Sequence, residues 1–390
     1  MSERKIKVFH LVIDEKFIDG VIEVFDRFQG THTNRYVFFP ENKVGKTFQF
    51  LKHHADQVVT VDRHKALSYI HEMPCDVMVM HNISTFPVED MAKIDRRIKV
   101  VWLAWGYDLY ASIKGHCPFI PITQYRPLTQ QALDRDWFNR IRMFAKRTRW
   151  HLLSYGRMLE EGVARVDYFS GVIPWEYDMM TRNSFFHARQ ADFTYFSLKP
   201  ESADEHEQSV NTNGNILLGN SAGNTNNHID VLEQLSHYDL GGRKVYVPLS
   251  YAGRKHYIWE VIKAGRKYMG DHFVPMNTFI PLPEYQKIIA SCGYAIFAIE
   301  RQQALSNIWM AIDNGLTIFL SSSSPLFQHL RQQGYHLFTT QDDLHLIAEG
   351  HHISAEEARE NHQVMLKYDS QERHIQKIKD FYRFLEGETA

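Results

Sequence analysis

Residues 215–228 read NILLGNSAGNTNNH, and residues 294–307 read YAIFAIERQQALSN. Each stretch begins as an apolar run typical of a buried strand, then changes to small and hydrogen-bonding residues ahead of a helical pattern. In a parallel α/β sheet, this junction lies at the carboxyl ends of the strands, where ligands bind. Two such junctions predict a doubly wound α/β domain in the second half of the chain, with a ligand site at one edge.

The first junction has the composition of a phosphate-binding loop. Gly219, Asn220 and Ser221 offer backbone N–H groups and polar side chains ahead of a helix N-terminus, whose partial positive charge favours anions. The Lys of a P-loop and the G-x-G-x-x-G spacing are both missing, which excludes those two fingerprints. An Asn-rich turn that caps the next helix has the same composition, so both interpretations stay open.

The second junction adds charge. Arg301 at a helix N-terminus opposes the macrodipole unless an anion or Glu300 lies nearby, and a diphosphate would match its planar fork. Glu300 or Asn307 would accept hydrogen bonds from ribose hydroxyls, and Gln302 and Gln303 lie at the same edge. A surface ion pair between Arg301 and Glu300 is the alternative.

Two more residues follow the strand expected at 244–248. Ser250 and Tyr251 would hydrogen-bond to a nucleotide base or stack on it, although a packing role for Tyr251 fits the pattern as well. Together these loops predict a nucleotide as the ligand. The predicted nucleotide-binding residues are Gly219, Asn220, Ser221, Ser250, Tyr251, Glu300, Arg301, Gln302, Gln303 and Asn307.

The first half of the chain alternates short apolar strands with helical segments, as expected for a second parallel sheet with helices on both faces. Three of its strand ends carry polar residues, Asp14, His81 and Asp108. Each is a candidate general base, and each is also explained as a helix cap or turn residue. Asp108 lies in the aromatic stretch 105–110, WGYDLY, whose composition is similar to that of a sugar-binding platform.

A helix expected at 137–157 carries six arginines and lysines and no acidic residue, with apolar residues near one face. Such a helix lies on an anionic membrane surface or contacts a lipid-phosphate acceptor. A core-facing helix with an arginine-rich outer side has the same pattern. The residues that would make the membrane or acceptor contact are Trp137, Arg142, Lys146, Arg149 and Trp150.

Length and composition limit the remaining possibilities. A chain of 390 residues is long enough for two domains, and the polar segment 199–214 is the expected linker. The formal net charge of -2 argues against a general nucleic-acid binder. No signal peptide or membrane span is apparent, so we expect a cytoplasmic protein. No metal is expected, because the D-x-D pattern at 134–136 lies in a helical, basic stretch.

Taken in order, these segments resemble glycosyltransferase family 56. The resemblance rests on the strand end at 10–14, WGYDLY at 105–110, GNS at 219–221, Val247-Pro248 with Tyr251, and RQQ at 301–303. The chain departs from the family pattern at two places where glycines are expected. Asn82 follows His81, and Ala304-Leu305-Ser306-Asn307 follows RQQ. These departures bear on the sugar and the acceptor more than on the reaction class.

The resemblance implies a GT-B architecture of two Rossmann-like domains facing across a cleft. Residues 1–200 would bind the acceptor, residues 215–350 would bind the nucleotide sugar, and helices within 351–390 would pack back toward the first domain. Such a protein would work at the inner face of the plasma membrane.

The implied reaction is a metal-independent transfer in surface polysaccharide synthesis. A sugar similar to 4-acetamido-4,6-dideoxygalactose would move from a TDP-linked donor to a polyprenyl-diphosphate-linked glycan. Two alternatives stay open, an NDP-sugar 2-epimerase of the same fold and a non-catalytic nucleotide-sugar-binding protein of a polysaccharide locus.

Overall fold

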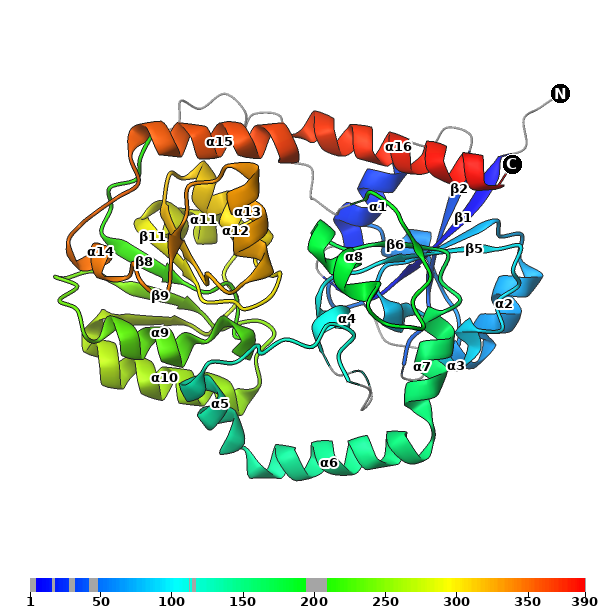
Figure 1. Ribbon diagram of the computed structural model, residues 1–390, viewed down its shortest axis with the longest axis horizontal. Coiled ribbons are helices and arrows are strands. Elements are labelled where there is room, and N and C mark those ends of the chain that lie inside the picture. Colours follow the sequence, from blue (N-terminus) through cyan, green and yellow to red (C-terminus); the bar gives the residue numbers. More distant parts are fainter. Residues whose placement is uncertain are drawn as a thin grey trace. The chain divides into compact units, whose positions relative to one another are not determined.

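The computed structural model describes residues 5–15, 18–27, 32–41, 48–111, 113, 117–193 and 209–389. The chain divides into two α/β units, each with its own parallel sheet (Figure 1). Unit 1 comprises Met1–Pro121, Phe144–Ala203 and Asp369–Ala390, and unit 2 comprises Ile122–Met143 and Asp204–Tyr368. This division differs from the expected domain limits, because residues 122–143 of the first half belong to unit 2. Most of the expected linker, residues 199–208, lies outside the described residues.

Unit 1 is built on a seven-stranded sheet in the order β3-β2-β1-β4-β5-β6-β7. Its central strands are nearly continuous apolar runs, as expected for a sheet covered on both faces, and all four residues of β4 are fully buried. Its strands are β1 Ile6–Val12, β2 His32–Phe38, β3 Val58–Thr60, β4 Val77–Met80, β5 Lys99–Leu103, β6 Tyr168–Ser170 and β7 Arg189–Gln190. Its helices are α1 Ile18–Asp26, α2 Ala66–Glu72, α3 Val88–Met91, α4 Tyr107–Tyr110, α7 Tyr155–Val163, α8 Pro174–Met180 and α16 Gln371–Thr389.

The C-terminal helix α16 is part of the core of unit 1. Ile378, Phe381, Tyr382 and Leu385 are all buried there against residues of the sheet and of α1. The Tyr382 hydroxyl donates a hydrogen bond to Asn34 Oδ1 at 3.0 Å. These apolar residues near the C-terminus therefore pack in a cluster that includes residues of β1 and α1, more than 300 positions earlier in the chain.

A buried pair of histidines lies beneath the sheet edge of unit 1. His10 Nδ1 and His81 Nε2 are 3.0 Å apart, and His10 Nε2 is 3.2 Å from Asn34 Oδ1. Because an amide oxygen only accepts, His10 donates through Nε2, and its Nδ1 accepts from His81. Burial lowers the pKa of His10 to about 3 and lowers the pKa of His81 well below its ordinary value. Both rings are therefore neutral in the folded state.

Unit 2 contains a six-stranded parallel sheet in the order β10-β9-β8-β11-β12-β13. Its strands are β8 Asn215–Leu218, β9 Val245–Pro248, β10 Phe273–Met276, β11 Cys292–Phe297, β12 Thr317–Leu320 and β13 Phe338–Thr339. Its helices are α5 Pro127–Asp134, α9 His228–Leu235, α10 Lys255–Met269, α11 Leu282–Ala290, α12 Leu305–Asp313, α13 Pro325–Gln333, α14 His345–Ala348 and α15 Ala355–Asp369. Helix α6, Trp137–Leu152, begins in unit 2 and ends in unit 1.

Helix α5 is docked on unit 2 by backbone capping and by packing. The carboxylate of Asp230, in the first turn of α9, accepts from the backbone N–H groups of Leu128 and Thr129 at 2.8 and 2.9 Å. Ala132 is buried in the core of unit 2. The N–H groups at a helix N-terminus lack partners within the helix and need other acceptors, and here an acidic side chain from the other half of the chain accepts from two of them.

No helix among the residues that the structure describes is long and apolar enough to cross a membrane.

The buried histidines predict a loss of stability in acid. An unfolded histidine titrates near 6.5, whereas the pKa of His10 is about 3 in the folded state. The unfolded chain therefore binds an extra proton below pH 6.5, so stability is complete above that pH and is lost as the pH falls toward 3. At pH 5 the loss for His10 is about 2 kcal/mol, measurable by hydrogen exchange of the β1 amides after correction for intrinsic rates.

His10→Gln is expected to remove that part of the pH dependence, and His187→Gln, at an exposed position, is expected to leave it intact. An unchanged pH dependence in His10→Gln would contradict the assignment of a neutral, buried His10.

Candidate functional site

The polar loops of unit 2 meet at one edge of its sheet. Every strand pairing recorded for this sheet is parallel, so the loops that follow all its strands leave from the carboxyl edge. Ligands of open α/β sheets bind at this edge. The loops concerned are 219–227 after β8, 249–253 after β9, 298–304 after β11, 321–324 after β12 and 340–341 after β13.

The two loops singled out from the sequence are joined by one side chain. Gln303 accepts from the Thr225 hydroxyl at 2.6 Å through Oε1 and donates to Asn220 Oδ1 at 3.0 Å through Nε2. Their strands, β8 and β11, are neighbours in the sheet. Residues more than 75 positions apart in the sequence therefore form one surface.

Gly219 is required by the shape of its loop. Its φ is +76°, and a Cβ there would lie 2.8 Å from His228 Nε2 and 3.0 Å from Asn226 Oδ1. Only glycine adopts such a φ without strain, and the closeness of His228 would exclude a larger residue in any case. Burial lowers the pKa of His228 to about 3, so this ring is a neutral support beneath the loop.

The loop 219–227 is largely satisfied within the protein. The backbone N–H groups of Gly219, Asn220, Ala222 and Gly223 already donate to acceptors of the chain. The Ser221 hydroxyl accepts from one of them and from the Asn226 amide. Four N–H groups of this loop are therefore already bonded within the protein, whereas the sequence suggested that they would be free to bind a ligand.

The two helix N-termini at this edge differ in charge. Helix α9 has Asp230 in its first turn, which opposes an anion there. Helix α12 follows Arg301 and has neither an acidic residue in its first turn nor a side-chain cap. Arg301 is half-buried and bonds through Nη1 to the carbonyl of Gln302 at 3.0 Å. Electrostatics therefore favour an anion at α12 over one at α9.

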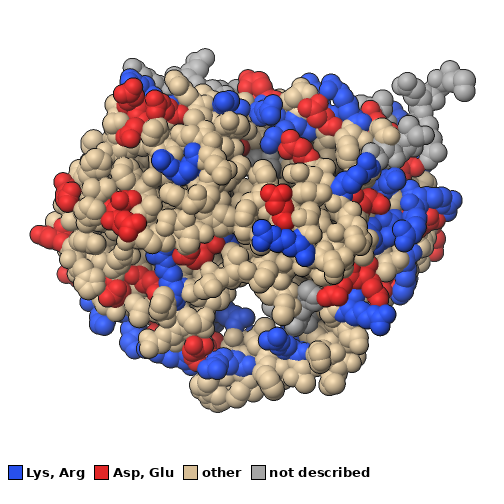
Figure 2. Space-filling model, viewed as in Figure 1, with Lys and Arg blue, Asp and Glu red and all other residues tan. Residues whose placement is uncertain are grey.

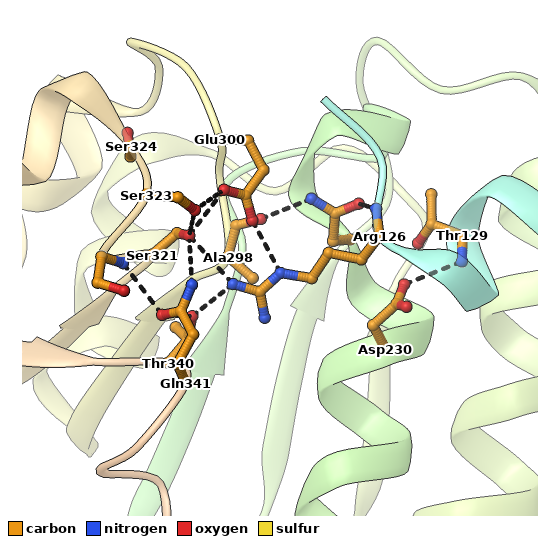
Figure 3. Close-up of polar contacts among 12 residues, drawn as sticks. Arg126, Thr129, Asp230, Ala298, Glu300, Ser321, Ser323, Ser324, Thr340 and Gln341 are labelled. Atoms are coloured by element: carbon orange, nitrogen blue, oxygen red, sulfur yellow. Dashed lines mark hydrogen bonds and ion pairs between the residues drawn. The ribbon is translucent and has the colours of Figure 1, made fainter. Parts of the chain in front are cut away.

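Glu300 is the centre of a polar network (Figure 3). Its Oε1 accepts from Arg126 Nε at 2.8 Å, and its Oε2 accepts from the hydroxyls of Ser321 and Ser323. Arg126 Nη2 also donates to Thr340 Oγ1 at 2.6 Å. The pattern 300–303 identified Glu300, but nothing in the sequence around Arg126 indicated that it would reach this edge.

The other predicted nucleotide contacts lie nearby in three different settings. Ser250 is exposed, and the carbonyl of Tyr251 accepts from the backbone N–H of Ala222. Gln302 is buried. Asn307 is on α12, where its Oδ1 accepts from the hydroxyl of Tyr285 at 2.7 Å. Ser250 and Tyr251 therefore lie next to the loop 219–223, whereas Asn307 is bonded to the neighbouring helix α11.

Asp14 is tied to a loop of unit 1. Its carboxylate accepts from the backbone N–H groups of Gln49, Phe50 and Leu51 at 2.6 to 3.1 Å. The side chain is half-buried at the carboxyl end of β1. A carboxylate held by three N–H groups is fixed in place, and its role as a base stays a prediction.

His81 and Asp108 are buried, in contrast to the exposed bases expected from the sequence. His81 is fully buried and bonded to His10, and Asp108 is 1% exposed. Asp108 accepts from the indole of Trp102 and from the backbone N–H of Trp105, both at 2.9 Å. His81 therefore contacts strand β1, Asp108 holds the residues that follow β5, and neither side chain reaches the surface.

A further carboxyl group was not singled out by the sequence. Glu176, at the start of α8, is fully buried and accepts from the Tyr110 hydroxyl at 2.7 Å and from the backbone N–H of Val172. Burial raises its pKa to about 7. Glu176 therefore holds the end of the segment WGYDLY in place, because Tyr110 is the last residue of that segment and of helix α4.

The described residues contain no group of three or more His, Cys, Asp or Glu side chains placed to hold a metal ion.

Helix α6 presents its apolar residues to solvent. None of its residues is buried, and Trp137, Phe138, Ile141 and Phe144 are 60 to 73% exposed. In the face shown in Figure 2, the surface over α6, at the bottom of the view, is mainly uncharged with Lys and Arg interspersed. Trp150 is half-buried against Tyr155. The core-facing alternative for this helix is therefore excluded.

Comparison with known sequences identifies the family. The family model described as "4-alpha-L-fucosyltransferase glycosyl transferase group 56" matches residues 156–360, more than half of the chain. The chain belongs to glycosyltransferase family 56. The match includes the loops 219–227 and 298–304 and ends within α15. A family 56 member is a glycosyltransferase, so the expected enzyme class is confirmed.

Solved structures show the same fold. HepE of Anabaena in complex with UDP and glucose matches with a TM-score of 0.62 and 10% identity over 97% of this chain and 100% of its own. The apo structure of OtsA matches with a TM-score of 0.60 and 9% identity over 98% of this chain and 99% of its own. An O-GlcNAc transferase of Thermobaculum terrenum matches with a TM-score of 0.55 and 10% identity over 99% of this chain and 68% of its own. These are GT-B glycosyltransferases, which confirms the GT-B fold.

The two positions where the resemblance leads us to expect glycine have a backbone conformation that glycine adopts readily. Asn82 has a φ of 114° and Ala304 a φ of 67°. Asn82 is partly compensated, because its side-chain oxygen accepts from the backbone N–H and hydroxyl of Ser84. Ala304 has no such side chain, so it carries the strain of a left-handed conformation uncompensated.

Restoring glycine at Ala304 is expected to stabilise the protein. The left-handed conformation costs an alanine roughly 1–2 kcal/mol, and glycine removes this cost. Glycine also makes the unfolded chain more flexible, which offsets about 0.5–1 kcal/mol of the gain in stability. Ala304→Gly should therefore raise the free energy of unfolding by up to about 1 kcal/mol, measured by urea denaturation.

Ala311→Gly is the matched control, because Ala311 lies within the helix α12, where glycine costs about 1 kcal/mol. A destabilising effect of Ala304→Gly equal to that of the control would show that position 304 is not strained.

Proposed function

We propose that this enzyme transfers a sugar from a nucleoside diphosphate, without a metal, to a polyprenyl-diphosphate-linked glycan. One observation carries the donor assignment. The loop that carries Glu300 and Arg301 lies at the carboxyl edge of unit 2, where Gln303 joins it to Asn220 and Thr225 of the loop after β8, and the helix α12 that follows has no side-chain cap. The family membership supplies the reaction class. The donor class is supported by HepE, whose structures contain UDP or UDP-glucose.

The diphosphate would bind between Arg301 and the first turn of α12. Negative charge grows on the departing nucleoside diphosphate as the glycosidic bond breaks, so fixed positive groups there lower the barrier. Arg301 and the α12 N-terminus supply such groups, and loop 219–221 closes the site from the side of β8. This arrangement supports a transfer that needs no metal.

The nucleoside would lie toward Glu300, Ser250 and Tyr251. Glu300 would accept from the pentose, and Ser250 and Tyr251 would contact the base. We propose TDP as the nucleotide and a sugar similar to 4-acetamido-4,6-dideoxygalactose, which rest on the family resemblance and not on the contacts.

The acceptor would bind at the carboxyl edge of unit 1. Asp14 is the half-buried carboxylate at that edge, and it would deprotonate the acceptor hydroxyl if the reaction inverts configuration. If the reaction retains configuration, Asp14 would orient the acceptor instead. His81 and Asp108 would act indirectly, by keeping the residues that they contact in position.

Helix α6 supports work at a lipid surface. Five arginines and lysines and no acidic residue accompany its exposed aromatic residues, which is the composition of helices that lie in an anionic membrane interface. Residues Trp137, Arg142, Lys146, Arg149 and Trp150 would contact the inner face of the plasma membrane, where a polyprenyl-linked acceptor resides. An NDP-sugar 2-epimerase of the same fold would need no such surface.

Arg301→Ala is expected to weaken the binding of nucleoside diphosphates at least about 10-fold and to lower kcat about 10²–10³-fold, because the variant loses a preorganised positive group at the leaving diphosphate. Calorimetric titration and steady-state kinetics measure the two effects.

Arg266→Ala is the matched control, because Arg266 is exposed in the last turn of α10. Equal nucleotide affinity in wild type and Arg301→Ala would remove Arg301 from the donor site.

Replacing Arg142, Lys146 and Arg149 with Glu is expected to abolish co-sedimentation with vesicles that contain anionic phosphatidylglycerol. The change reverses the charge that holds the helix on the lipid, where each basic residue contributes about 1 kcal/mol.

The control makes the same charge change at the exposed lysines 255, 263 and 267 of α10, and this variant should still sediment. Sedimentation of the α6 variant at the wild-type level would show that α6 is not the lipid contact.

A further inference from the structure

Arg126 reaches the donor edge from the first half of the chain. Its backbone N–H donates to Asn227 Oδ1 at 2.9 Å, and Asn227 also donates to the carbonyl of Ala298 at 2.7 Å. Asp230 holds the next residues, at the start of α5. These contacts fix the backbone of the segment, and the side chain of Arg126 extends from it toward Glu300 (Figure 3).

The ion pair between Arg126 and Glu300 is shielded from water. The two side chains are 16% and 12% exposed, and their atoms Nε and Oε1 are 2.8 Å apart. Arg126 Nη2 donates to Ser321 and Thr340 as well. A shielded carboxylate depends strongly on its partners, so Arg126 fixes the orientation of Glu300.

Glu300 keeps one acceptor site for a ligand. A carboxylate has about four lone-pair positions. Ser321 and Ser323 occupy the two on Oε2, and Arg126 occupies one on Oε1. The fourth position is therefore on Oε1, the same oxygen that accepts a hydrogen bond from Arg126. Any hydroxyl bound there is therefore positioned by Arg126, although Arg126 need not touch it.

We propose that Arg126 is a positioning residue of the donor site, which directs Glu300 onto the 3′-hydroxyl of the nucleotide pentose. This inference rests on the proposed nucleotide-sugar function. The 3′-hydroxyl is the relevant group because both ribonucleotides and thymidine nucleotides carry it. Specificity for the pentose then depends on a residue 174 positions before Glu300 in the chain.

A purely structural role for Arg126 makes a different prediction. Arg135, on the same segment, pairs with Glu260 of α10 at 3.3 Å. If Arg126 only fastened α5 to unit 2, loss of either arginine would affect nucleotide binding in the same general way. If Arg126 acts through Glu300, its loss removes discrimination at the 3′-hydroxyl in particular.

The experiment is a calorimetric comparison of TDP with 3′-deoxy-TDP, and of UDP with 3′-deoxy-UDP, on the full chain. Wild type is expected to bind the 3′-hydroxyl form about 10-fold or more tightly, the usual effect of one hydrogen bond to a charged group. Arg126→Gln and Glu300→Gln should bring this ratio close to 1. Arg126→Lys, which keeps the charge but not the planar fork, should give an intermediate ratio. Arg135→Gln should keep the wild-type ratio.

The outcomes separate this inference from the function on which it rests. A wild-type ratio in folded Arg126→Gln, or a ratio of 1 in wild type, would overturn the role of Arg126 while leaving the nucleotide site intact. The inference would also fail if Arg135→Gln lowered the ratio as much as Arg126→Gln. Failure of wild type to bind TDP or UDP would overturn the proposed function and this inference together. Circular dichroism confirms that each variant is folded.

Discussion

Parallel strand pairing is the constraint on which the site depends. Every pairing recorded between described strands runs in parallel, so each strand returns through a crossover and all polar strand-end loops of a unit leave at one edge. In unit 2 this places Asn220, Thr225 and Gln303 within hydrogen-bonding distance. The polar loops of unit 2 therefore come together through the strand topology, without a contiguous sequence motif.

The same constraint explains how much could be predicted. Alternating apolar strands and helices were sufficient for the α/β class, and the junctions at 215–228 and 294–307 located the edge of unit 2. These features are encoded locally, by periodicity and by abrupt changes of composition. The two positions where the resemblance leads us to expect glycine, Asn82 and Ala304, both have a positive φ.

The rest depends on contacts between distant parts of the chain. Arg126 lies in an ordinary helix start, and contacts with residues about 100 to 200 positions later in the chain, such as Asn227 and Glu300, hold it at the carboxyl edge of unit 2. His81 and Asp108 are polar residues at strand ends, and the sequence cannot show that His10 and Trp102 enclose them. The loop 219–227 has the composition of an anion site, but its N–H groups bond largely within the protein. Which polar group meets a ligand is decided by what else it contacts.

We propose that the carboxyl edge of unit 2 binds a nucleoside diphosphate without a metal. Calorimetric titration of the wild-type chain with TDP, UDP and GDP, each with and without EDTA, tests it most directly. We expect saturable binding of at least one of these nucleotides, TDP foremost, with the same affinity in the presence of EDTA. Absence of binding by all three, or binding that EDTA abolishes, would contradict it.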